Sequence, residues 1–252
     1  MMIRVAVAGP RGRMGALAVE TMVTGKDFLL VGVLDRKMAE KADTLAGAVP
    51  IYTDMGTLAQ EAQPDVLVEL TNHESVYPHT RDAILNGIRP VVGTSGLKEE
   101  QITKLSELAS EHKIGCILAP NFSVGAALLM KFASMAVKYM PDAEIIEMHH
   151  DGKKDFPSGT AALTARMMAD SKGADPNQPD GRGTDISGVP VHSVRLPGLL
   201  SHQEVLFGGE GQLLTLRHDS FSRQSYMSGM KLAVKDVMNR DRLIDGLDKI
   251  IG

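Results

Sequence analysis

The feature that most constrains the fold is a glycine-rich turn between an apolar run and a segment with helical periodicity. Residues 3–8 read IRVAVA, which predicts a buried strand, and Gly9, Gly12 and Gly15 follow at once as G-x-x-G-x-x-G. Residues 13–23 then carry apolar side chains at helical spacing. Glycines in this context allow a tight turn and close approach of the backbone to a pyrophosphate, whose charge a helix N-terminus favours. The pattern predicts the first unit of a dinucleotide-binding sheet.

The residues between these glycines extend the candidate cofactor site. Arg11 and Arg13 place positive charge beside the expected pyrophosphate. An ordinary strand-to-helix connection is the alternative interpretation of the turn on its own. The candidate cofactor-binding residues in the turn are Gly9, Pro10, Arg11, Gly12, Arg13 and Met14.

An acidic residue at the end of the second predicted strand, residues 28–34, supports the same interpretation. Asp35 follows Gly15 by twenty residues, where a carboxylate accepts hydrogen bonds from the adenosine ribose hydroxyls. Strand ends also favour Asp as a turn residue, which is the structural alternative. Arg36 can pair with a 2′-phosphate, whereas Asp35 would repel one. The sequence therefore predicts NADH, NADPH or both as cofactor, and we expect both to bind.

Strands and helices alternate through the rest of the first half. The predicted strands are 65–70, 90–92 and 114–119, and the predicted helices are 75–86 and 98–112. This order is typical of a parallel sheet with helices on both faces, in which ligands bind at the carboxyl ends of the strands. Two loops at such ends are either ordinary turns or further cofactor contacts, namely Gly93, Thr94 and Ser95, and Ala119, Pro120, Asn121 and Phe122.

The pattern changes near residue 121. The remaining predictions are helices at 124–139, 161–170 and 227–238, strands at 143–148, 189–196, 203–207 and 213–217, an exposed loop at 176–188 and a glycine turn at 208–211. Successive strands joined by a tight turn indicate an antiparallel or mixed sheet. We therefore predict an α/β protein with two domains and a boundary near Ser123. The first is a Rossmann-like parallel-sheet domain and the second an α+β mixed-sheet domain, while the last helices fit either domain.

Composition excludes several classes of protein. Cys116 is the single cysteine and cannot form an internal disulfide, no apolar run approaches the length of a membrane span, and no signal-like segment precedes the first strand. The formal net charge of −4 and the 4% aromatic content argue against a nucleic-acid-binding protein. We expect a cytoplasmic protein with neither a nucleic-acid nor a membrane partner.

The densest chemistry lies in residues 147–160, which read EMHHDGKKDFPSGT. His149 and Lys153 can both donate protons, and the Ser-Gly-Thr run opens a helix whose free N–H groups suit a carboxylate. The alternatives are solvated surface lysines and a plain N-cap at Ser158. His149 and His150 are adjacent at a strand end, where successive side chains point in opposite directions, and no third ligand follows. We therefore predict no metal site.

The segment from Glu144 to Ala161 closely resembles the signature of the dihydrodipicolinate reductases, also called 4-hydroxy-tetrahydrodipicolinate reductases. The turn at 9–15, the loop at 93–95 and the Asn-Phe-Ser-Val-Gly run at 121–125 match that family in order and spacing. The resemblance covers essentially the whole chain. It implies NAD(P)H-dependent reduction of a small cyclic dicarboxylate in diaminopimelate and lysine biosynthesis, by a homo-oligomer that is a tetramer in the family.

The resemblance also implies domain boundaries and residue roles. Residues 1–123 and 224–252 would form the dinucleotide-binding domain, and residues 124–223 the substrate-binding and oligomerisation domain. His149 would be the acid/base and Lys153 the proton donor. The substrate carboxylates would be held by His150, Ser158, Gly159 and Thr160.

Two places depart from the family pattern. Asp151-Gly152 stand where bulkier or basic residues are common, which could weaken the positive field at the site, and His73 stands where proline is expected. Two other functions are weighed against the reductase. One is another amino-acid-pathway dehydrogenase of related architecture, such as one acting on aspartate or homoserine, and the other is a non-catalytic nucleotide-sensing protein of the same fold. The His-His-x-x-Lys and Ser-Gly-Thr cluster argues against both.

Overall fold

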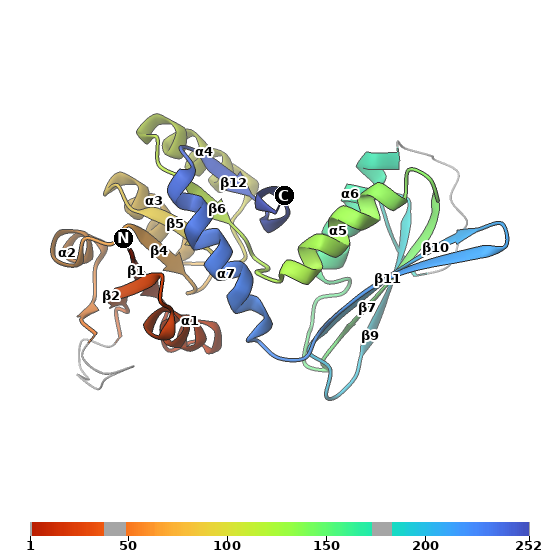
Figure 1. The fold of residues 1–252 in the computed structure, drawn as a ribbon, viewed down its shortest axis with the longest axis horizontal. Helices are drawn as coiled ribbons and strands as arrows, with labels where there is room; N and C mark the ends of the chain where they lie inside the picture. The colour runs from red at the N-terminus through yellow and green to blue at the C-terminus, as the bar shows by residue number, and fades with distance from the viewer. Residues whose placement is uncertain (1, 38–48, 173–182, 252) are drawn as a thin grey trace. The chain divides into compact units, whose positions relative to one another are not determined.

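The computed structural model describes residues 2–37, 49–172 and 183–251. The chain divides into two compact units. The first unit comprises Met1–Phe122 and Tyr226–Ile250, and the second Ser123–Ser225. Each unit has its own sheet and its own hydrophobic core, so each is described by itself (Figure 1).

The first unit contains a parallel sheet whose described strands lie in the order β12-β6-β5-β4-β1-β2-β3. Every described ladder between these neighbours is parallel. The strands are β1 (Ile3–Ala8), β2 (Phe28–Leu34), β3 (Ile51–Tyr52), β4 (Val66–Glu69), β5 (Arg89–Val92), β6 (Cys116–Leu118) and β12 (Leu243–Asp245). All four residues of β4 are buried, as expected of a central parallel strand covered on both faces.

The helices of the first unit follow the apolar spacing of the sequence. In α1 the buried residues Gly15, Ala18, Val19 and Met22 recur at helical intervals and form one face. Ala83 of α3 and Leu58 of η1 are buried in one hydrophobic cluster with residues of β1 and β4. The helical elements are α1 (Arg13–Thr24), α2 (Met55–Thr57), η1 (Leu58–Ala62), α3 (Val76–Leu85), α4 (Glu99–His112), α7 (Ser225–Asp236), η2 (Val237–Asn239) and η3 (Leu247–Ile250).

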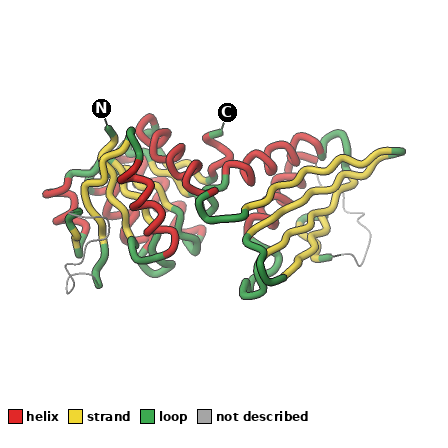
Figure 2. The backbone as a smooth tube through the Cα atoms, turned by 60° about the horizontal axis from the view of Figure 1, so that its bottom comes forward, coloured by secondary structure: helices red, strands yellow, loops and turns green. Residues whose placement is uncertain are grey.

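The second unit contains a mixed sheet in the order β11-β10-β7-β9-β8, in which only the β7–β9 pair is parallel among the described ladders. Two helices, α5 (Val124–Ala136) and α6 (Gly159–Lys172), lie against this sheet (Figure 2). They share one apolar core with it, built around Leu129, Ala165 and Phe207. The strands are β7 (Asp142–His149), β8 (Thr184–Ile186), β9 (Val189–Arg195), β10 (Ser201–Gly209) and β11 (Gln212–Ser220).

The fold class predicted from the sequence is confirmed. The predicted turn at residues 208–211 joins β10 to β11 but is shorter than expected. Gly208 and Gly209 still pair within β10, and only Glu210 and Gly211, the latter at φ 67°, form the turn. The prediction of an exposed loop at 176–188 is wrong at Thr184–Ile186, which forms β8 against β9. Ser187 and Gly188 both have positive φ and close this hairpin. Residues 173–182 of the chain, which include part of that predicted loop, lie outside the described residues.

Other elements were missed or misjudged at their ends. The polar stretch after Asp35 contains β3, α2 and η1 in its described part, while residues 38–48 lie outside it. The short strand β12 pairs with β6, and a run of three residues is too short to predict a strand whose partner is distant in the sequence. The helix predicted at 124–139 ends at Ala136. The final helix α7, which the pattern could not assign, lies in the first unit except for its first residue.

Within the described ranges, no helix is both long and apolar enough to cross a bilayer.

Candidate functional site

The turn after β1 has a backbone that requires glycine. Gly9 has φ 80°, and a Cβ there would lie 2.5 Å from the carbonyl oxygen of Leu70. A Cβ on Gly15 would lie 2.0 Å from the carbonyl oxygen of Gly9. The N–H of Gly12 donates to the same Gly9 oxygen at 3.1 Å, and α1 starts one residue later with no side-chain cap. The turn therefore brings backbone close to the sheet and leaves helix N–H groups to face a ligand.

A pocket of about 210 Å³ lies beside this turn in the first unit. It draws on the carboxyl ends of β1, β2 and β4. Because β1 has β2 on one side and β4 on the other, this is where the strand order reverses and where open α/β sheets bind ligands. The described lining residues are Gly9, Arg11, Gly12, Leu34, Asp35, Arg36, Lys37, Leu70, Thr71, Asn72, Ser75 and His79.

The charged residues predicted from the sequence meet at one end of this pocket. Arg11 donates through Nε to Asp35 Oδ2 at 2.5 Å and through Nη2 to Asp35 Oδ1 at 3.0 Å. Burial raises the pKa of the Asp35 carboxyl, but hydrogen bonds from Arg11 and the Lys37 N–H outweigh it, so the pKa lies below its ordinary value. Arg36 donates to Ser75 Oγ at 3.0 Å. Asp35 is therefore an anion held between donors.

The other predicted cofactor residues do not line this pocket in the part of the chain that the structure describes. Gly93 lies where a Cβ would come within 2.5 Å of the Phe122 ring, so this glycine allows close packing after β5. Thr94 Oγ1 donates to the Glu69 carbonyl at 3.5 Å, and the Ala119 N–H donates to the Val92 carbonyl at 2.8 Å. Both loops thus stand at the carboxyl ends of neighbouring strands, along the same edge as the pocket.

A buried carboxylate at this edge escaped the sequence reasoning. Glu69, the last residue of β4, is completely buried, and its Oε1 accepts a hydrogen bond from Thr71 Oγ1 and faces His79 Nδ1 at 3.3 Å. Its Oε2 has no hydrogen-bond partner among the described residues. His79 in turn lines the pocket. A carboxyl side chain within a four-residue apolar strand was the available signal.

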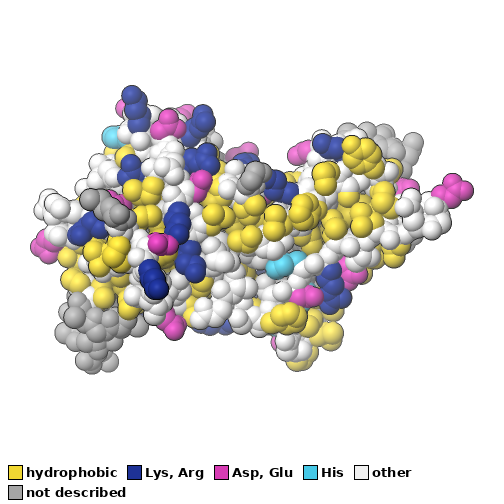
Figure 3. Space-filling view, in the orientation of Figure 1, with side chains coloured by type: hydrophobic (Ala, Val, Ile, Leu, Met, Phe, Trp, Pro, Cys, Tyr) yellow, Lys and Arg dark blue, Asp and Glu magenta, His cyan; other side chains and the backbone are white. Residues whose placement is uncertain are grey.

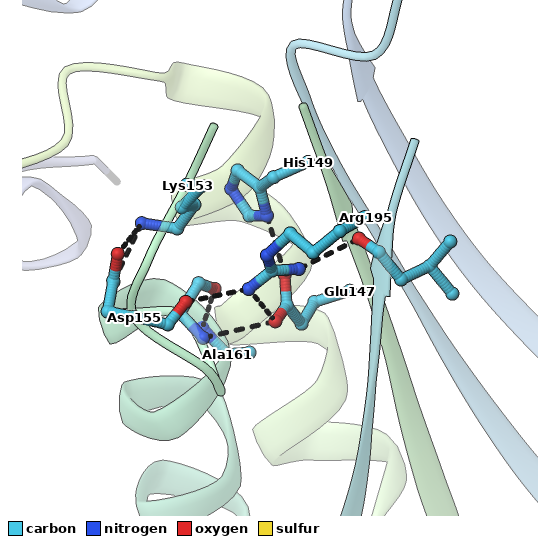
Figure 4. Close-up of polar contacts among 8 residues, drawn as sticks. Glu147, His149, Lys153, Asp155, Ala161 and Arg195 are labelled. Carbon is cyan, nitrogen blue, oxygen red and sulfur yellow. Dashed lines mark hydrogen bonds and ion pairs between the residues drawn. The ribbon is translucent and has the colours of Figure 1, made fainter. Parts of the chain in front are cut away.

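In the second unit the chemistry gathers at the end of β7. Glu147 and His149 are two residues apart on this strand, so their side chains share a face, and Glu147 Oε2 lies 2.5 Å from His149 Nδ1. Arg195, at the end of the parallel neighbour β9, donates to both Glu147 oxygens at 3.0 and 2.7 Å. The Ser158 N–H donates to Glu147 Oε1 at 3.2 Å. Figure 4 shows this carboxylate joined to His149 on one side and Arg195 on the other.

The fully buried Glu147 determines which nitrogen of His149 is available. Burial raises the pKa of Glu147, but hydrogen bonds from His149 and Arg195 outweigh it and lower the pKa to about 2. Glu147 is therefore an ionised acceptor at neutral pH, and His149 Nδ1 must carry the proton between them. His149 Nε2 is left as the atom that can exchange a proton with a bound molecule.

The loop after β7 is organised by the same arginine. Lys153 Nζ lies 2.7 Å from both Asp155 carboxylate oxygens, and Arg195 Nη2 donates to the Asp155 carbonyl at 2.8 Å. The hydrogen bond from Lys153 lowers the pKa of Asp155. Lys153 is thus held by a carboxylate that is itself largely exposed, as drawn in Figure 4. A proton donor on a short tether near His149 is a suitable arrangement for acid catalysis.

At the start of α6, the polar groups of Ser158 are already hydrogen-bonded within the protein. Ser158 Oγ accepts from the Ala161 N–H at 3.2 Å, and its own N–H is used by Glu147, so this residue acts as an N-cap. Gly159 is exposed, and a Cβ there would meet nothing within 4 Å. His150 is half-buried, and its carbonyl accepts from the Lys153 N–H at 3.1 Å. Open space for an anion therefore lies beside Gly159, at the first turn of α6.

The two departures from the family pattern have definite surroundings. His73 packs against the loop after β5, since a Cβ on Gly96 would lie 2.9 Å from His73 Cβ. Asn72 Oδ1 accepts from the N–H groups of Glu74 and Ser75 at 3.0 Å, which closes the turn without proline. Asp151 accepts from the Gly152 N–H at 3.1 Å and is exposed.

The described ranges contain no group of three His, Cys, Asp or Glu side chains arranged to hold a metal ion.

Comparison with known proteins decides the family. Residues 3–122 match the family model of the dihydrodipicolinate reductase N-terminus, and residues 125–251 match that of the C-terminus. This chain belongs to the dihydrodipicolinate reductase family. The 4-hydroxy-tetrahydrodipicolinate reductases of Lysinibacillus sphaericus and Geobacillus kaustophilus are each 51% identical to it, with both chains covered completely. A solved dipicolinate-bound dihydrodipicolinate reductase from Paenisporosarcina is 47% identical, with a TM-score of 0.89 over all of both chains.

Two residues of the cluster at the end of β7 were not assigned roles from the sequence. Glu147 is recognisable afterwards, because its spacing of two from His149 on a strand places both on one face. Arg195 lies 48 residues further along the chain from Glu147. Only the β7–β9 pairing, which sets His149 opposite Arg195, brings it to the site.

Proposed function

We propose that this chain reduces 4-hydroxy-tetrahydrodipicolinate, through its dehydrated form, to tetrahydrodipicolinate with NADH or NADPH, as a step of diaminopimelate and lysine biosynthesis. The observation that carries the proposal is the orientation of His149 by the buried Glu147, with Lys153 on the adjoining loop. Relatives that bear this activity in their names are 51% identical over the whole chain. The His-His-x-x-Lys and Pro-Ser-Gly-Thr elements stand intact.

The residues of the first unit fit a nicotinamide dinucleotide. A Cβ at Gly9 or Gly15 would strike backbone of the turn or of the neighbouring strand end, so these glycines keep the turn tight. The start of α1 that follows offers N–H groups that suit a pyrophosphate. The backbone of the turn from Gly9 to Met14 would hold the pyrophosphate, Asp35 the adenosine ribose and Arg36 a 2′-phosphate. The side chain of Arg11, which pairs with Asp35, would lie at the ribose end. The loops at 93–95 and 119–122 would hold the nicotinamide half. The bound cofactor supplies a hydride to the substrate.

The second unit is suited to a dicarboxylate. The solved Paenisporosarcina relative is a dihydrodipicolinate reductase with dipicolinate bound. We assign the carboxylate contacts to His150, Ser158, Gly159 and Thr160, with the N-terminus of α6 as the strongest element. Because Ser158 already caps the helix, we expect Gly159 and Thr160 to carry more of the binding than Ser158.

Proton transfer falls to two side chains. Addition of hydride to one carbon leaves the adjacent position with carbanion character, which an acid must protonate. Lys153 donates that proton from Nζ, while His149 holds or accepts a proton at Nε2. Glu147 and Arg195 position these groups and do not themselves touch the substrate.

One assay tests the activity. The purified chain receives NADH or NADPH with the product of the preceding synthase, and oxidation of the cofactor is followed. Turnover with at least one cofactor is expected, whereas no turnover with either cofactor would contradict the proposed function.

A binding measurement tests the role of Arg36. Arg36→Ala should weaken NADPH binding, and unchanged affinity would contradict the role given to Arg36.

Variants then test the roles. We expect His149→Ala and Lys153→Ala to lower kcat by roughly a hundredfold or more, the size of a lost general acid. Lys154→Ala is the matched control, because it removes an exposed lysine from the same loop and should leave kcat unchanged. Thr160→Ala should raise KM for the substrate without altering cofactor affinity. Retention of kcat in both His149→Ala and Lys153→Ala would reassign catalysis to other residues.

The second unit is also our candidate for assembly. Figure 3 shows hydrophobic side chains gathered along α5, where Phe132 is 48% exposed and Tyr139, just beyond the helix, is 84% exposed. We propose a homotetramer assembled through this unit, with residues 1–123 and 224–252 forming the cofactor domain. Light scattering on the purified chain tests the state, and a monomer at assay concentration would contradict it.

A further inference from the structure

The adenosine end of the pocket carries an unusual balance of charge. Among the described lining residues, three cationic side chains, from Arg11, Arg36 and Lys37, accompany a single carboxylate, that of Asp35. The side chain of Asp35 is 8% exposed, so its charge bears directly on whatever occupies the pocket. A carboxylate at the ribose end ordinarily favours a free 2′-hydroxyl and repels a 2′-phosphate.

Asp35 in this chain is not a free carboxylate. Arg11 grips both of its oxygens, at 2.5 and 3.0 Å, and the Lys37 N–H donates to Oδ1 at 2.9 Å. Ionised carboxylates offer about four lone-pair positions, and the described residues supply three donors. Of these donors only the Arg11 Nε reaches Oδ2, so this oxygen keeps room for a ribose hydroxyl. The ion pair thus reduces the negative charge without removing the acceptor.

The second arginine faces a different partner. Arg36 donates to Ser75 Oγ at the start of α3, and His79 of the same helix lines the pocket close to the buried Glu69. Within the described residues, the guanidinium of Arg36 is therefore not paired with a carboxylate and stays available to a phosphate. The two arginines therefore differ in role. Arg11 neutralises the charge of Asp35, whereas Arg36 remains available to bind the ligand.

We propose that Arg11 is a specificity-determining residue, which neutralises Asp35 and so lets the site accept the 2′-phosphate of NADPH as well as the 2′-hydroxyl of NADH. The inference rests on the cofactor role under the proposed function. Arg11 is 51% exposed and its pair with Asp35 lies at the edge of the pocket, so the charge can be removed without disturbing a core.

Direct binding to the full chain tests this without substrate. Calorimetry gives Kd for NADPH and NADH, and for the fragment pair adenosine 2′,5′-bisphosphate and AMP, which differ only by the 2′-phosphate. The variants are Arg11→Ala, Asp35→Asn and the double variant. Arg81→Ala is the control, because it removes an arginine that pairs with a neighbouring aspartate and does not line the pocket.

In Arg11→Ala we expect NADPH and the bisphosphate to bind about tenfold more weakly, while NADH and AMP change by less than about twofold. In the Asp35→Asn background the same Arg11 substitution should change NADPH binding by less than about twofold, because no charge is left to compensate. Arg81→Ala should change none of the four constants.

Two results would overturn the inference. Equal weakening of NADPH and NADH in Arg11→Ala would make Arg11 a general cofactor contact. A tenfold loss of NADPH affinity that persists in the Asp35→Asn background would make Arg11 a direct phosphate ligand. Both results concern binding alone, so they are separate from the turnover assay, which tests the proposed function.

Discussion

Two of the arginine–carboxylate pairs in the described residues are alike in geometry and differ in burial. Arg11 holds Asp35 at 2.5 and 3.0 Å, and Arg195 holds Glu147 at 2.7 and 3.0 Å. The side chain of Arg11 is 51% exposed, whereas that of Arg195 is 18% exposed and Glu147 is completely buried.

This difference separates two uses of the same chemistry. Solvent screens the half-exposed Arg11 guanidinium, so its pair with Asp35 adjusts the local charge of a binding pocket with little effect on folding. If the buried pair loses one partner, the other is left as an uncompensated charge in the interior. The pair therefore holds His149 and the loop that follows it in one geometry.

The largest effect is expected on breaking the buried pair. Arg195→Ala would leave Glu147 ionised in the interior without its guanidinium partner, a loss that typically destabilises a protein by about 3–5 kcal/mol. Chemical denaturation measures it. Arg217→Ala, which breaks an exposed pair with Asp219, is the control and should leave the unfolding midpoint unchanged. Similar midpoints for the two variants would erase the distinction drawn between buried and exposed pairs.

Acid should reveal the same buried charge. The pKa of Glu147 is about 2 in the folded chain against an ordinary value of 4.5, so ionised Glu147 stabilises the fold above about pH 4.5. That contribution, roughly 3 kcal/mol at neutral pH, is lost as pH falls toward 2. The difference in unfolding free energy between the unaltered chain and Glu147→Gln should therefore shrink on acidification. A difference that is constant with pH would show that Glu147 acts only through its shape.

A smaller effect is expected at the helix that follows. Ser158→Ala removes the acceptor for the Ala161 N–H and should cost about 1 kcal/mol of stability. Ser158→Thr keeps a hydroxyl cap and should recover most of that loss in thermal unfolding. If Ser158→Ala melts like the unaltered chain, the hydroxyl does not serve as the cap and is free for substrate.

The smallest effect is expected at the exposed pair. Arg11→Ala should leave the melting temperature within error of the unaltered chain, since a half-exposed guanidinium adds little to folding. Arg81→Ala provides the matched comparison. A clear drop in melting temperature confined to Arg11→Ala would mean that this pair supports the turn after β1 as well as the pocket charge.

Local pattern was enough for much of the architecture. The apolar run at 3–8, the glycines at 9, 12 and 15 and the helix that follows are contiguous, so their geometry is written in adjacent residues. The short strands β3, β8 and β12 were missed because two or three residues form a strand only when a neighbour pairs with them.

By itself the sequence determined the parallel-sheet class, the glycine turn and the segment that holds His149 and Lys153, because each depends on residues close together in the chain. Only the tertiary structure brought Arg195 to Glu147, set Arg11 on Asp35 and left Arg36 with Ser75. Side chains 24 to 48 residues apart meet through strand pairing and turns. The charge of each of these side chains is compensated by a neighbour in space, and the spacing of residues along the sequence does not predict which neighbour that is.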